Sequence, residues 1–132
     1  MASRGGNAKR VDEDVVAEQG LLVQRGSIVT LKKKIGELGT LALVVSNDIQ
    51  NEAAEFLIVA PLERRKSRLE APFAVNLGRS EGLRDLHTAR CDRLMSVAKS
   101  EVKSLERARV GEVVLSQLEE ALAVALGFSR VI

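Results

Sequence analysis

A short apolar run with an abrupt polar end is the feature that most constrains the fold of this chain. Leu41 to Val45 reads LALVV and stops at Ser46-Asn47-Asp48. The run is too short to cross a membrane and too rich in Leu and Val for an exposed surface. A continuous apolar run of this length, bounded by turn residues, is typical of a strand buried on both faces. We therefore expect a buried strand here, followed over residues 46–52 by a turn or one helical turn.

Other short strands are expected on both sides of this run. They cover residues 27–31, residues 56–60 with Pro61 closing the strand, residues 73–77 and residues 87–94. Glycine-containing or charged loops are expected over residues 32–40 and 62–72. Residues 95–99 are expected to stay extended or turn, and residues 102–109 to contain a short helical turn.

The C-terminal segment predicts the clearest helix. From Glu112 to Gly127, apolar residues recur at positions 114, 115, 118, 121, 122, 125 and 126, which is the helical period. Glu112 lies in the first turn, where negative charge is favourable, and Gly127 is a suitable C-terminal stop. Phe128 is expected to pack back on the last turn.

Several short strands followed by one long helix indicate an α+β domain. The expected fold is a small SH3-like antiparallel barrel, or a strongly curved sheet, with the helix covering its open side. We expect residues 25–132 to form this single domain. Residues 1–24 are expected to form a disordered or partly helical N-terminal extension, with a frayed helix over residues 11–19.

Composition excludes several classes of site. One cysteine and one histidine exclude an internal disulfide and a metal centre built from these residues. Trp and Tyr are absent, so a base-stacking platform of the RRM or OB type is not expected. The net charge of +2 permits a polyanionic partner without requiring one. With no membrane-length apolar stretch and no secretory signal in the sequence, a cytoplasmic location is the default expectation.

Two groups of charged residues stand out: an Arg–Asp pair, and basic loop residues able to bind the phosphates of a nucleic acid. Arg90 and Asp92 are two residues apart, so on a regular strand they share a face. The basic loop residues are Lys32, Lys33 and Lys34 in one segment, and Arg64, Arg65, Lys66 and Arg68 in another. A plain alternative stays open for both groups: a surface ion pair for the first and solvated loops for the second. His87 and Cys91 are expected on the opposite strand face, with Cys91 in the core.

Six segments in order resemble the MazF/PemK toxin family, including its Kid-like branch. They are RGSIVTL, a glycine-containing loop, LALVVSNDIQN, FLIVAPL, the strand PFAVNL and a final glycine-introduced helix. The most specific match lies between the last two of these segments: Ala89-Arg90-Cys91-Asp92 is similar to an Arg-Cys-Asp-Gln stretch of the PemK/Kid branch. The resemblance covers roughly residues 25–128.

This resemblance implies a sequence-specific endoribonuclease toxin that cleaves single-stranded messenger RNA. It also implies a homodimer, no metal or other cofactor, and a small antitoxin that neutralises the toxin. The family's catalytic Arg and Asp correspond to Arg90 and Asp92. A carboxylate such as Asp92 can accept the proton of the attacking ribose 2′-OH, and a guanidinium such as Arg90 can stabilise charge on the phosphate.

Three positions depart from the family pattern. Thr40-Leu41 stands where the family usually has Arg-Pro, and Thr40 is kept as a candidate RNA-binding residue. Glu63 stands near the position of a phosphate-contacting Thr or Ser, and Arg93 replaces the Gln after the acidic residue. An alternative function is therefore open: a CcdB-like toxin that binds DNA gyrase without chemistry, or a degenerate member that retains only partner binding.

Overall fold

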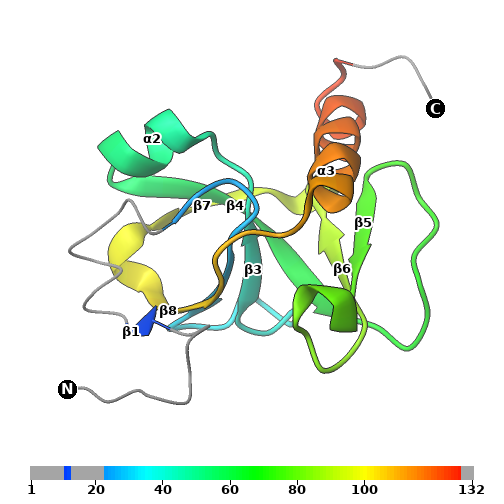
Figure 1. The fold of residues 1–132 in the computed structure, drawn as a ribbon, viewed down its shortest axis with the longest axis horizontal. Helices are drawn as coiled ribbons and strands as arrows, with labels where there is room; N and C mark the ends of the chain where they lie inside the picture. The colour runs from blue at the N-terminus through cyan, green and yellow to red at the C-terminus, as the bar shows by residue number, and fades with distance from the viewer. Residues whose placement is uncertain (1–10, 13–22, 129–132) are drawn as a thin grey trace.

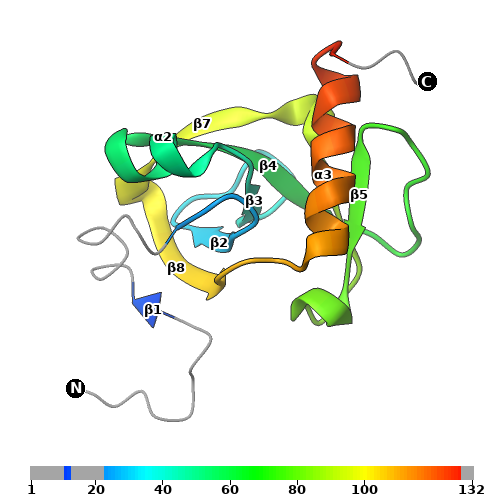
Figure 2. The same cartoon turned by 45° about the horizontal axis from the view of Figure 1, so that its top comes forward.

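The computed structural model describes residues 11–12 and 23–128. It shows a single, strongly curved antiparallel sheet with the C-terminal helix packed against it (Figures 1 and 2). The strands are β1 (Val11–Asp12), β2 (Ile28–Leu31), β3 (Leu41–Val44), β4 (Phe56–Arg64), β5 (Ala74–Leu77), β6 (His87–Arg90), β7 (Met95–Ala98) and β8 (Val102–Arg107). The α-helices are α2 (Asp48–Ala53) and α3 (Glu112–Ala125), and short 3-10 helices are η2 (Arg79–Glu81), η3 (Cys91–Arg93) and η4 (Lys99–Glu101). The predicted α+β class, with a curved sheet and a long last helix, is confirmed.

The order of the strands brings early and late parts of the chain together. Within the described residues the order is β1-β8-β2-β3-β4-β6-β5, and β7 pairs with β4 off this path. Val29 on β2 lies opposite both Ala42 on β3 and Leu105 on β8. The late strand β8 therefore closes the sheet beside the early strand β2, as the curved wall in Figure 2 shows.

Strand β3 is buried on both faces, as its sequence predicts. Leu43 packs into one core cluster, whereas Ala42 and Val44 pack into a second cluster, and all three side chains are fully buried. The two clusters lie on opposite sides of the strand because successive side chains point to opposite faces. A continuous apolar run was required because neither face of β3 meets water.

The first core cluster includes the buried face of α3. Leu115, Leu118 and Ala121 are the buried residues of this helix, and they pack with residues of β5 and β6 such as Val75 and Ala89. In both views α3 lies beside β5 (Figures 1 and 2). The predicted helical period therefore identified the packed face, except at Leu126, which is 56% exposed. None of the helices in the described parts of the chain is long and apolar enough to cross a membrane.

The polar stop after β3 forms the N-terminus of α2. The Asn47 side chain accepts a hydrogen bond from the Gln50 backbone N–H at 2.8 Å, which caps the helix. Asn51 is fully buried and donates to the Ser46 carbonyl at 2.9 Å. The expected helical turn is confirmed, and these side chains fix where the chain leaves the sheet.

Glycine is required where the chain enters β2. Gly26 has φ +95°, and a Cβ atom there would lie 2.8 Å from Leu115 Cδ2. Its N–H donates to the Val44 carbonyl and its carbonyl accepts from the Val110 N–H. Gly26 thus lets the backbone pass directly under α3 while tying β3 to the segment before that helix.

The expectation that Pro61 closes a strand is wrong. Strand β4 continues through Pro61 to Arg64, so the expected loop begins at Arg65 rather than at Leu62. On one edge, β4 pairs with β7 over residues 56–59 and with β6 over residues 62–64. Pro61 falls between these partners, at a position where a strand tolerates a residue without an N–H.

Other local expectations are also wrong. Residues 91–93 form η3 instead of continuing a strand, and residues 102–107 form β8 instead of a helical turn. The Phe128 side chain is 83% exposed, although its N–H closes the helix end by donating to the Ala123 carbonyl. At the N-terminus, Val11–Asp12 pairs with β8 as strand β1, and the rest of the expected frayed helix lies outside the described residues.

Replacing Leu118 with Ala should destabilise the protein by about 3 kcal/mol, because the change leaves a cavity between α3 and the sheet. The matched control is Val113→Ala on the same helix, where the side chain is 71% exposed and the expected change is below about 0.5 kcal/mol. Urea unfolding of both variants measures the difference. Equal effects would contradict the packing described for α3.

Candidate functional site

The candidate site lies where β6 ends and the chain turns into η3. Strand β6 lies between β4 and β5, with Thr88 opposite Glu63 on one side and Asn76 on the other. Arg90 is the last residue of β6, and η3 begins directly after it. The tight turn of η3 brings Asp92 back toward Arg90, so the two side chains meet although they do not share a strand face.

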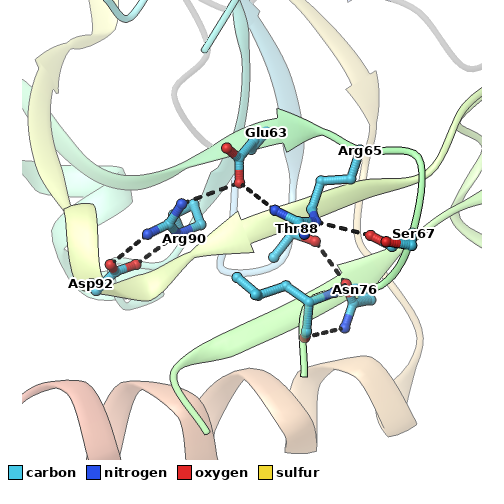
Figure 3. A network of polar contacts seen from close by, with 8 residues as sticks. Glu63, Arg65, Ser67, Asn76, Thr88, Arg90 and Asp92 are labelled. Atoms are coloured by element: carbon cyan, nitrogen blue, oxygen red, sulfur yellow. Dashed lines mark hydrogen bonds and ion pairs between the residues drawn. The ribbon is translucent and has the colours of Figure 1, made fainter. Parts of the chain in front are cut away.

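Two carboxylates hold the guanidinium of Arg90 (Figure 3). Arg90 Nε donates to Asp92 Oδ1 at 2.9 Å, and Nη2 donates to Asp92 Oδ2 at 2.7 Å. Arg90 Nη1 donates to Glu63 Oε1 at 3.1 Å. The guanidinium also lies over the Phe73 ring at 5.9 Å from the ring centroid. The plane and position of the Arg90 guanidinium are therefore fixed, and so are the directions of its remaining N–H groups.

These contacts change the acidity of both partners. The hydrogen bonds from Arg90 lower the pKa of Asp92, against the opposing effect of partial burial. The hydrogen bond to Asp92, together with that to Glu63, raises the pKa of Arg90. Asp92 therefore stays ionised, and Arg90 stays a cation, across the physiological pH range.

A second set of polar contacts extends from Glu63 to the loop after β4. Glu63 Oε1 also accepts from Arg65 Nη1 at 3.3 Å, and Arg65 Nε donates to the Ser67 carbonyl at 2.9 Å. Asn76 anchors the same loop, because its amide exchanges two hydrogen bonds of 3.0 Å with the Leu69 backbone. Figure 3 shows this continuous network from Asp92 through Arg90 and Glu63 to the loop.

A cleft of about 640 Å³ opens beside Glu63. Its lining consists of Ile35, Gly36, Glu37, Leu38, Pro61, Glu63 and Arg93. One wall is therefore the loop between β2 and β3, and the other is the far end of β4 with η3. The cleft carries charges of both signs, so it can accept donor and acceptor groups from a ligand.

The lysine run does not line this cleft. Lys32, Lys33 and Lys34 are exposed, and Lys33 and Lys34 line a separate hollow of about 340 Å³ against Phe56 and Met95. The Lys32 backbone N–H donates to the Glu101 carbonyl at 2.8 Å. The loop that carries the lysines thus presents its later part, residues 35–38, to Glu63.

In the second basic segment, residues 64–66, one residue joins the site and two do not. Arg65 joins the site through Glu63, whereas Arg64 pairs with Asp85 at 3.4 Å and Lys66 is exposed. Thr40 is half-buried, and its carbonyl accepts from the Leu31 N–H at 2.8 Å. Roles of these residues in RNA binding remain predictions.

The residues flanking Arg90 in sequence are structural. Cys91 is 2% exposed and packs in the core, as expected. Burial, with a smaller contribution from the Asp92 charge, raises the pKa of the Cys91 thiol to about 12. His87 is buried, and its Nδ1 lies 2.9 Å from the Asp85 carbonyl oxygen. Among the described residues, no group of His, Cys, Asp and Glu side chains is placed to hold a metal ion.

The sequence does not indicate Asn76 as a site residue. It places Glu63 near the position of the family's phosphate-contacting Thr or Ser, but in a loop after Pro61 and without a role of its own. No local pattern marks the continuation of the strand, because Leu62 is followed by an unbroken charged run from Glu63 to Lys66. Asn76 does have a signal, since it is the polar residue between the apolar Val75 and Leu77 of β5, which are buried.

Comparisons with known proteins identify the fold. A family model for PemK-like, MazF-like toxins of type II toxin–antitoxin systems matches residues 24–126. An endoribonuclease in complex with its cognate antitoxin, from a mycobacterial species, superimposes with a TM-score of 0.65 at 23% identity, covering 80% of this chain and 96% of that chain. MazE–MazF from Deinococcus radiodurans gives a TM-score of 0.60 at 23% identity, covering 80% and 97%. No curated protein matches this chain by sequence.

The family match and the shared fold place this chain among the toxins of type II toxin–antitoxin systems. Within that class, the chain belongs to the PemK-like, MazF-like family. The likeness to the solved structures establishes the common architecture of the curved sheet and the C-terminal helix.

The Arg90–Asp92 pair should make the stability of the protein depend on pH in acid. The pKa of Asp92 is lower in the folded protein than in the unfolded chain, where it is about 3.9. Its contribution is therefore fully present above that value and is lost as the pH falls through the folded-state pKa. In urea unfolding, Asp92→Asn should be less stable than wild type at pH 7, and the difference should shrink below about pH 4. Glu70→Gln, at an exposed ion pair, should show little difference at either pH.

Cys91 should be unreactive in the folded protein. At pH 8 a thiol with a pKa of about 12 is ionised in only about one molecule in 10,000, and the thiolate is the reactive form. Labelling by a disulfide reagent such as DTNB should therefore be slow in buffer and rapid in urea. Rapid labelling of the folded protein would contradict the inward orientation of Cys91.

Proposed function

We propose that this protein is the toxin of a type II toxin–antitoxin system and a metal-independent endoribonuclease that cleaves single-stranded messenger RNA. The observation that carries the proposal is the Arg90 guanidinium, held between Asp92 and Glu63 beside a cleft. Membership of the PemK-like, MazF-like family supports the reaction class, and solved neighbours with the same fold are named endoribonucleases.

Arg90 supplies electrostatic stabilisation in this proposal. A guanidinium has five N–H donors, and the carboxylates engage three of them in Arg90. One N–H remains on each terminal nitrogen, so Arg90 can donate to a phosphate without losing its carboxylate partners. These donors would stabilise the extra negative charge on the phosphate oxygens in the pentacoordinate transition state.

Cleavage proceeds through attack of a ribose 2′-OH on the adjacent phosphate. A carboxylate at the site accepts the 2′-OH proton, the new O–P bond forms and the P–O5′ bond breaks. The products are a 2′,3′-cyclic phosphate and a 5′-hydroxyl. Asp92 and Glu63 are the two carboxylates that contact Arg90, so each is a candidate for this base. Asp92 also orients the guanidinium, whichever of the two accepts the proton.

The proposed partners are a cognate antitoxin and a second copy of this chain. One solved neighbour is an endoribonuclease with its cognate antitoxin, which supports the first. Exposed large apolar side chains provide surface for protein contacts; they are Ile49, Phe56, Val113, Leu126 and Phe128. A messenger RNA substrate also places the proposed activity in the cytoplasm.

Arg90→Ala should lower RNA cleavage by at least about 100-fold, because the substituted site loses the donors to the transition state. The assay is incubation of purified protein with mixed-sequence single-stranded RNA in EDTA, with analysis of the product ends. Arg109→Ala serves as the control, because Arg109 is an exposed arginine that lies before α3 and pairs with Glu112 in its first turn.

No cleavage by the wild type across a wide range of RNA sequences would contradict the enzymatic proposal. Inhibition of DNA gyrase supercoiling by the same preparation would then favour the gyrase-binding alternative. Cleavage that requires a divalent cation would contradict the metal-independent mechanism.

A further inference from the structure

Glu63 has a carboxylate oxygen that the protein leaves available. Its Oε1 atom accepts from Arg90 Nη1 at 3.1 Å and from Arg65 Nη1 at 3.3 Å. Its Oε2 atom accepts no hydrogen bond from any residue in the described part of the chain. Glu63 also lines the 640 Å³ cleft and is half-buried, with 26% of its side chain exposed. One oxygen is therefore fixed by two arginines while the other can receive a proton.

Asp92 is arranged differently. Both of its carboxylate oxygens accept hydrogen bonds from the same guanidinium, at 2.9 and 2.7 Å. Those hydrogen bonds lower the pKa of Asp92 and so weaken it as a base. Neither Asp92 nor Arg90 lines the cleft, so Glu63 is the one of these three side chains that does. These features suit a residue that holds Arg90 in place.

The position of Glu63 in the sheet brings it close to any phosphate on Arg90. Glu63 on β4 lies directly opposite Thr88 on β6, and Arg90 follows two residues later on the same strand. The Nη1 atom that donates to Glu63 keeps a second N–H, which is one of the two left for a phosphate. A phosphate bound there would lie next to the Glu63 carboxylate.

We propose that Glu63, and not Asp92, is the general base that accepts the proton of the ribose 2′-OH, and that Asp92 is the positioning residue for Arg90. This inference rests on the proposed endoribonuclease function and assigns one step of it. The 2′-OH proton passes to Glu63 Oε2 as the 2′-oxygen bonds to phosphorus. The P–O5′ bond then breaks, the 5′-oxygen takes a proton from water, and Glu63 later releases its proton to solvent.

The test compares pH–rate profiles of wild type, Glu63→Gln and Asp92→Asn on one cleaved RNA in EDTA. Glu63→Gln should lower kcat/KM by about 100- to 10,000-fold and should remove the limb of the profile that rises with pH in acid. Asp92→Asn should lower the rate but retain that limb, because the base is still present. Glu63→Asp should retain it as well. Glu119→Gln on α3, an exposed carboxylate with an arginine partner, is the control.

Two results would overturn the assignment. The first is a Glu63→Gln profile that keeps the acid limb while Asp92→Asn loses it, which would make Asp92 the base. The second is near-wild-type cleavage by Glu63→Gln. Urea unfolding of each variant shows whether lost activity reflects lost folding. As a second check, Glu63→Asp should keep the part of the pH–rate profile that rises with pH in acid. Failure of the wild type to cleave RNA overturns the proposed function itself, and is thereby distinguished from failure of the Glu63 assignment.

Discussion

Strand β4 is the constraint on which the rest of the structure depends. It pairs with β3 along one edge, and along the other it pairs first with β7 and then with β6. The change of partner occurs around Pro61, where a strand can do without an N–H. Because the same strand serves both parts of the sheet, its second half carries Glu63 away from the β7 side and places it opposite β6. The contact between Glu63 and Arg90 follows directly from that change of partner.

The charges at the site balance within a small group of side chains. Glu63 and Asp92 contribute two negative charges, and Arg90 and Arg65 contribute two positive charges. The charges of this network already balance before any ligand arrives, so a phosphate gains from the remaining directed N–H groups more than from a surplus of positive charge. Attraction at longer range would come from exposed basic residues such as Lys66, and salt would screen it.

The sequence predicted the parts of the fold that depend on periodicity. The apolar run of β3, the helical turn that follows it and the buried face of α3 each follow from local pattern, and each is confirmed. Partner exchange by a strand is not local, so the passage of β4 through Pro61 could not be read from the chain. Arg90 and Asp92 do meet, but through the turn of η3 rather than along a strand. The sequence also could not show that residues 35–38, and not the lysines 32–34, face the cleft. Which part of a loop faces a cleft depends on tertiary packing.

The pairing of β2 with β8 also affects how the chain can fold during synthesis. Val29 emerges from the ribosome long before its partner Leu105, so the wall of the sheet beside β2 stays open until β8 has been made. Contacts between residues so distant in sequence form slowly, because a long loop must close first. The strands that carry Glu63 and Arg90 are closer in sequence and can pair earlier. A nascent chain would therefore assemble the neighbourhood of Arg90 before it completes the sheet around β2.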